Sequence, residues 1–88
     1  MSADEVITQA AQLITGGDYG GAMGVFEQYI ESNPDDPAGY HGWAEAALFD
    51  IQENGNLDDK GNDRINEGQI NAYFRRAANM APDNADYN

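Results

Sequence analysis

The chain has 88 residues, one histidine, no cysteine and a formal net charge of −12, from 16 acidic and four basic side chains. This length allows one domain over residues 1–88, and the lack of cysteine excludes disulfides, thiol nucleophiles and cysteine-based zinc sites. The acidic field argues against nucleic acid and membranes as partners. With neither a signal-peptide pattern nor a membrane-length apolar run, we expect a cytoplasmic protein.

The first half of the chain predicts two helices joined by a tight turn. Ser2 and Glu5 have the spacing of a capping box, and the apolar residues that follow recur at helical intervals. The two glycines at 16–17 end this first helix, and Asp18 is placed to cap the next one. The apolar residues of the second helix are Ala22, Val25, Phe26, Tyr29 and Ile30.

The second half predicts another helix pair, separated by a polar insertion. Asp36 is placed to cap a third helix, with Pro37 in its first turn and an expected end between residues 50 and 53. The insertion, at about 51–65, is rich in Asp, Asn and Gly and predicts a loop. Asn66 can cap a fourth helix, which the sequence at 82–84 ends. No segment alternates like a strand, so the predicted class is all-α.

The two halves share a spacing of marker residues. Ala22 precedes Phe26 by four positions and Pro34 follows eight later, and the same intervals recur at Ile70, Phe74 and Pro82. The phenylalanines are 48 residues apart, which equals a repeat of about 34 residues plus an insertion of about 14. Aromatic residues at helical spacing are more typical of a core than of a ligand platform, which predicts a core role for Phe26, Tyr29, Tyr40, Trp43 and Phe74.

In these residues the chain resembles the tetratricopeptide repeat (TPR) family. The resemblance implies two antiparallel helix-turn-helix hairpins, stacked as a short right-handed α-solenoid. Repeat one would cover residues 3–36, and repeat two residues 37–84 with the inserted loop. Residues 85–88 would begin a further repeat or form a tail. The sequence departs from the family at Gln9, where leucine is expected, and at Ile70, where a small residue is expected.

The resemblance also implies a function, because first helices of successive TPR repeats line a groove for partner segments. Here that groove would be apolar with an acidic rim, and it lacks the basic clamp that some members use for a carboxylate. We therefore expect a non-catalytic interaction module for a protein or peptide, with basic residues on the partner as one interpretation of the charge and simple solubility as the other. The matching groove residues are Ile7, Ala11, Ile14, His41, Glu45, Leu48 and Phe49.

The insertion carries the alternative hypothesis, weak binding of a cation such as calcium by Asp58, Asp59, Asn62 and Asp63. Calcium prefers oxygen ligands at alternate residues, as in an EF-hand loop. Counted from Asp59, however, Arg64 replaces the required glycine and Ile70 the bidentate glutamate. A solvated acidic loop is the competing interpretation. In this alternative the chain is a self-associating structural piece. Under either function two further expectations stay open, a homodimer or a fragment of a longer repeat protein whose other repeats cover the groove.

The sequence offers little for catalysis or cofactors. His41 and Glu45 lie one helical turn apart, but a lone pair of this kind lacks a nucleophile and makes a poor metal site. The glycine-rich stretch at 16–24 lacks the preceding strand and the lysine of a phosphate-binding loop. We therefore expect no enzyme activity and no cofactor.

Overall fold

The computed structural model describes residues 2–81, which form four α-helices: α1 (Ala3–Thr15), α2 (Tyr19–Ser32), α3 (Pro37–Asn54) and α4 (Glu67–Met80). These residues include no strand, only an isolated bridge between Leu57 and Asp63, so the all-α prediction is confirmed. Within the same residues no helix combines the length and apolar character that a membrane crossing requires. The predictions for residues 82–84 and 85–88 lie outside the described residues.

All four predicted helix starts are confirmed by their N-caps. Each cap side chain accepts a hydrogen bond from a backbone N–H in the first turn of its helix, which typically stabilises a protein by about 1 kcal/mol. In α1 the hydroxyl of the capping serine also contacts the Glu5 carboxylate, at 3.2 Å. The caps and their donors are Ser2 with Glu5, Asp18 with Gly21, Asp36 with Ala38, and Asn66 with Gln69.

The end of the third helix differs from the prediction. The helix continues to Asn54, so the connecting loop covers 55–66 rather than about 51–65. Two contacts stabilise its last turn: Ile51 packs partly buried against the core, and the Asn54 side chain donates to Asp50 at 2.9 Å. Gly55 then ends the helix with a φ of 76°, a conformation that favours glycine.

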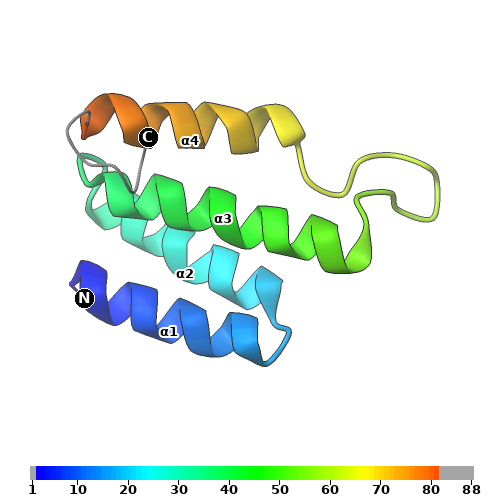
Figure 1. Ribbon diagram of the computed structural model, residues 1–88, viewed down its shortest axis with the longest axis horizontal. Coiled ribbons are helices and arrows are strands. Elements are labelled where there is room, and N and C mark those ends of the chain that lie inside the picture. Colours follow the sequence, from blue (N-terminus) through cyan, green and yellow to red (C-terminus); the bar gives the residue numbers. More distant parts are fainter. Residues whose placement is uncertain (1, 82–88) are drawn as a thin grey trace.

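Helix α3 is the centre of the fold and packs against all three other helices. Consecutive helices run in alternating directions, so that α1 and α3 point the same way (Figure 1). Small residues permit the close approach. Ala44, Ala46 and Ala47 are completely buried, and a Cβ atom on Gly42 would lie 2.2 Å from the Phe26 ring of α2. The α2–α3 contact therefore depends on a glycine at position 42.

Aromatic side chains join α3 to α4. The Tyr73 ring lies edge-on to Tyr40, at a centroid distance of 5.2 Å, and to Trp43, at 5.1 Å. Arg76 places its guanidinium 4.7 Å from the centre of the Tyr40 ring. The predicted core role of the aromatic residues is confirmed for Phe26, Tyr29, Tyr40 and Trp43, which are buried, whereas Phe74 is only half-buried.

Candidate interaction face

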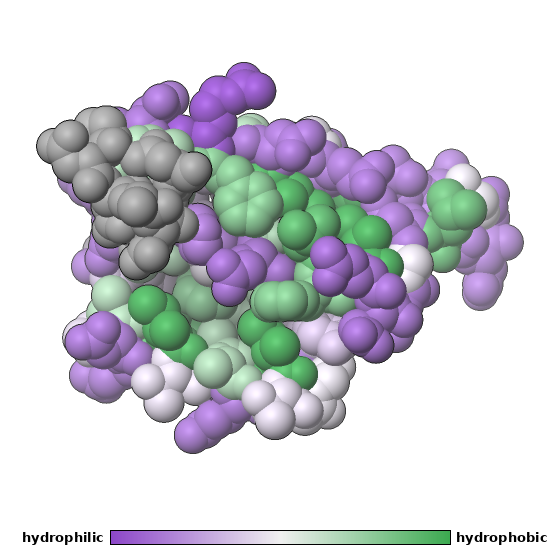
Figure 2. All heavy atoms as spheres, viewed as in Figure 1, coloured by the Kyte–Doolittle hydropathy of each residue, from purple (hydrophilic) through white to green (hydrophobic). Residues whose placement is uncertain are grey.

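The seven predicted groove residues lie on two neighbouring helices, α1 and α3, which contact each other. We call the surface that they form the α1–α3 face. Its large apolar members are unusually accessible: Ile7 is 45% exposed, and Leu48 and Phe49 are each 39% exposed. In the view of Figure 2, hydrophobic atoms gather along α1 and beside α3, with hydrophilic atoms between and around them. Three of the four exposed large apolar side chains among the described residues thus lie on α1 and α3, and the fourth, Leu57, lies in the loop at 55–66 and is 67% exposed.

Helical periodicity explains why these side chains stay outside the core. Val6 and Ala10 point inward and are 2% and 1% exposed. Ile7 and Ala11 directly follow them in the chain, so each lies at the edge of the buried stripe of the helix. The same offset on α3 places Glu45 and Leu48 beside the buried Ala44 and Ala47. Ile14 is intermediate, because it packs partly against the core.

His41 connects the α1–α3 face to α4. Its Nδ1 lies 3.6 Å from Oε2 of Glu45, and its ring meets the ring of Phe74 at 5.4 Å with an interplanar angle of 71°. Phe74 therefore borders the face, although the sequence placed it only among the core residues. Nothing local in the sequence indicates this contact, since it joins residues on either side of the insertion.

The α1 side of the face contains a shallow hollow of about 480 Å³, lined by Ile7, Thr8, Ala11, Gln12 and Thr15. Two of these residues were predicted and three polar ones were not. Thr8, Gln12 and Thr15 are all exposed, so their hydroxyl and amide groups are accessible beside the apolar side chains. The face thus continues around α1 with hydrogen-bonding groups at its margin.

A second hollow, of about 270 Å³, lies between α1 and α2 and contains no charged residue. Gln9 lines this hollow. This side chain stands where the TPR family has leucine, and it is exposed rather than packed between the helices. The first hairpin instead closes around buried residues on both helices, including Val6, Ala10, Ala22 and Phe26. The lining residues are Val6, Gln9, Val25, Gln28, Tyr29, Ser32 and Asn33.

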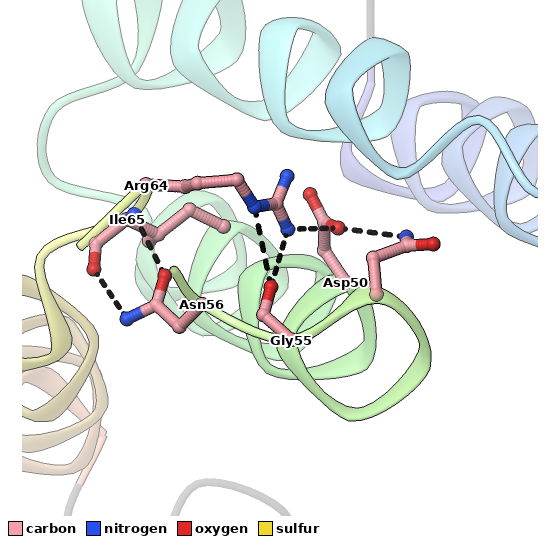
Figure 3. Close-up of polar contacts among 6 residues, drawn as sticks. Asp50, Gly55, Asn56, Arg64 and Ile65 are labelled. Carbon is pink, nitrogen blue, oxygen red and sulfur yellow. Dashed lines mark hydrogen bonds and ion pairs between the residues drawn. The ribbon is translucent and has the colours of Figure 1, made fainter. Parts of the chain in front are cut away.

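The loop at 55–66 is organised by its own hydrogen bonds. The Asp58 carboxylate accepts from the backbone N–H groups of Lys60 and Asn62, at 2.8 and 2.9 Å, and Gly61 completes this turn with a φ of 81°. At the base of the loop, the Asn56 side chain pairs in both directions with the backbone of Ile65, at 2.8 and 2.9 Å (Figure 3). The Asp58 carboxylate therefore stabilises the turn at 58–62, and Asn56 stabilises the base of the loop.

Arg64 attaches this loop to the end of α3. Its Nη2 lies 2.8 Å from Oδ1 of Asp50 and also donates to the Gly55 carbonyl at 2.8 Å, as Figure 3 shows. Burial of Asp50 is the largest single influence on its pKa and acts to raise it. Hydrogen bonds from Arg64 and Asn54, with the positive charge of Arg64, outweigh burial and lower the pKa of Asp50 below its ordinary value.

The four residues of the proposed cation loop, Asp58, Asp59, Asn62 and Asp63, are all exposed. Across residues 2–81, no group of three His, Cys, Asp or Glu side chains is arranged to hold a metal ion. One carboxylate oxygen of Asp58 already accepts two backbone N–H groups. The geometry therefore offers the cation hypothesis no ligand cluster.

The protein is thus a small all-α protein with accessible apolar side chains on two adjacent helices. No protein-family model, curated protein or solved structure matches the chain.

Proposed function

We propose that the chain is a non-catalytic, TPR-like protein–protein interaction module whose α1–α3 face binds an apolar segment of a partner. One observation supports this most strongly: Ile7, Leu48 and Phe49 are 45%, 39% and 39% exposed on adjacent helices, although the core closes without them. Grouped apolar exposure of this kind is typical of interaction sites. A cytoplasmic location, expected from the sequence, is part of the same proposal.

The size of the exposed apolar side chains is compatible with useful affinity. Fully burying one large apolar side chain contributes about 1.5–3 kcal/mol. Ile7, Leu48 and Phe49 are already more than half covered, so each has roughly half of that contribution left to gain. Three such residues would supply a few kcal/mol, equivalent to a Kd of about 1 mM before the cost of ordering the peptide is subtracted, so further contacts of the peptide must supply the rest of the affinity.

The arrangement of the helices supports the TPR-like part of the proposal. Alternating helix directions and the contact between α1 and α3 are what two stacked hairpins would produce (Figure 1). In such a stack the first helix of each hairpin faces the same side. The right-handed solenoid is thus the arrangement that we propose for the four helices.

Replacing two residues of the face tests this function. The probe is a fluorescein-labelled 14-residue peptide with leucine at helical spacing and glutamine elsewhere, whose binding is followed by anisotropy. The double variant His41→Ala/Phe49→Ala removes two rings from the face, and we expect it to weaken binding about tenfold, which corresponds to the loss of about 1.4 kcal/mol. Circular dichroism should show that the variant remains helical.

A matched control is available on α2, where Gln28 and Ser32 are exposed and lie outside the face. The variant Gln28→Ala/Ser32→Ala should bind the peptide as the original chain does. Equal affinity of the original chain and the His41→Ala/Phe49→Ala variant would refute the proposed location of the site.

A further inference from the structure

Charge is distributed very unevenly along the chain. All four basic side chains fall between positions 60 and 76, whereas residues 1–59 contain every acidic side chain except Asp63, Glu67, Asp83 and Asp86. Helices α1, α2 and α3 therefore contain no lysine or arginine at all. Positive charge is confined to the loop at 55–66 and to α4.

Two of the four basic residues have partners outside the α1–α3 face. Arg64 is paired with Asp50 at the base of the loop, at 2.8 Å, and Arg76 lies over the Tyr40 ring at 4.7 Å. The face itself includes Glu45, whose side chain is 51% exposed one turn before Phe49. Asp4 is exposed one turn before Ile7. Each helix thus places a carboxylate beside its exposed apolar side chains.

A ligand that covers the face must accommodate those carboxylates. Removing a carboxylate from water without a partner is unfavourable, so a purely apolar ligand would lose affinity wherever it covers Glu45 or Asp4. A lysine or arginine on the ligand would pair with the carboxylate and would also be attracted from a distance by the net charge of −12. A second copy of this chain has the same acidic surface and would be repelled.

We infer that the partner segment is basic as well as apolar, with lysine or arginine side chains over Glu45 and Asp4 and apolar side chains over Ile7, Leu48 and Phe49. This inference rests on the proposed function and specifies the class of partner. It assigns separate roles to the two kinds of residue: the apolar side chains supply the contact area, and the carboxylates select the charge of the ligand.

Three 14-residue peptides with the same leucine positions test the charge preference: one has lysine at the remaining positions, one glutamine and one glutamate. At about 20 mM salt we expect the lysine peptide to bind at least tenfold more tightly than the glutamine peptide, and the glutamate peptide to bind weakest. The difference should shrink at about 0.5 M salt, where charges are screened within a few ångströms.

Two variants separate local pairing from general attraction, since each removes one negative charge from the chain. Glu45→Gln changes the face, whereas Glu31→Gln changes an exposed residue of α2 outside it. We expect Glu45→Gln to weaken the lysine peptide about threefold, an effect typical of an exposed ion pair, and Glu31→Gln to weaken it clearly less. Neither substitution should alter the affinity of the glutamine peptide by a comparable factor.

The outcomes distinguish the two proposals. If the lysine and glutamine peptides bind equally and both respond to Phe49→Ala, the interaction face is supported and the preference for a basic partner is wrong. If Glu45→Gln and Glu31→Gln weaken the lysine peptide equally and Phe49→Ala has no effect, the attraction is diffuse and the inference is overturned. If none of the three peptides binds, the proposed function is overturned as well.

Discussion

The α1–α3 face and the loop at 55–66 differ in what holds their residues in place. On the face, regular helices position apolar side chains that contribute little to the core, and Leu48 and Phe49 are each 39% exposed. In the loop, polar side chains form the structure themselves, through Asp58, Asn56 and the Arg64–Asp50 pair. The exposed residues of the face should therefore be replaceable with little loss of stability, whereas particular residues of the loop should not.

The largest expected effect on stability is that of Arg64→Ala. This change leaves Asp50, whose side chain is only 11% exposed, without its cation, and it removes both donors to the Gly55 carbonyl. An unpaired buried carboxylate is strongly unfavourable. Because Arg64 is itself partly exposed, we expect a loss of about 2 kcal/mol, measured by urea unfolding. Lys60→Ala in the same loop serves as the control and should cost less than about 0.5 kcal/mol.

The pH dependence of stability provides a second test of the same pair. Because the folded chain holds the pKa of Asp50 below its ordinary value of 3.8, the ionised carboxylate contributes stability at pH values above 3.8. That contribution disappears as the pH falls through the lowered folded-state pKa. We expect the difference in unfolding free energy between the original chain and Asp50→Asn to shrink as the pH is lowered from 5 to 2. A difference that stays constant over this range would contradict the assigned pairing.

A smaller and more local effect is expected for Gly61→Ala. The backbone at Gly61 has a φ of 81°, with nothing within 4 Å of an added Cβ, so the cost is conformational strain rather than a clash. We expect a loss of about 1 kcal/mol, with faster amide hydrogen exchange at Lys60 and Asn62. Gly20→Ala is the matched control, because this helical glycine also has open space around it and no positive φ; alanine there should be neutral or stabilising.

The smallest effect on stability is expected on the face itself. Leu48→Ser removes a partly exposed apolar side chain and should lower the free energy of unfolding by no more than about 1 kcal/mol, while it weakens the binding of the leucine-containing peptides. The comparison with Ala47→Ser is direct, since that neighbouring residue is completely buried and its substitution should destabilise the chain measurably. Equal destabilisation by both substitutions would mean that the face is part of the core.

The parts of this structure that depend on short stretches of sequence were predictable. The N-caps at Ser2, Asp18, Asp36 and Asn66 act within four residues of their donors, and helical periodicity alone separates Ile7 from Val6. For this reason the helix starts and the all-α class follow from local patterns, whereas the groove residues were selected through the TPR resemblance. The antiparallel order of α1, α2 and α3 follows from the short connections between them.

Contacts between distant residues could not be predicted in the same way. Arg64 counted in the sequence only as a departure from a calcium-binding pattern, whereas its pairing with Asp50 spans 14 residues and attaches the loop to the last turns of α3. Gly42 gave no signal, because its role depends on where the Phe26 ring falls. The same holds for the contact of Phe74 with His41 across the insertion. A helix is encoded locally, but its neighbours depend on the whole chain.

The most direct test of the central claim is to map peptide binding onto the chain by amide chemical-shift changes. With ¹⁵N-labelled protein and the leucine–lysine peptide at about 20 mM salt, the proposal predicts the largest changes at the seven face residues of α1 and α3 and at the neighbouring Phe74. Residues 57–62 of the loop and the outer positions of α2 should change little. Largest changes in the loop, or changes spread evenly over all acidic positions, would contradict the assignment of the α1–α3 face as the binding site.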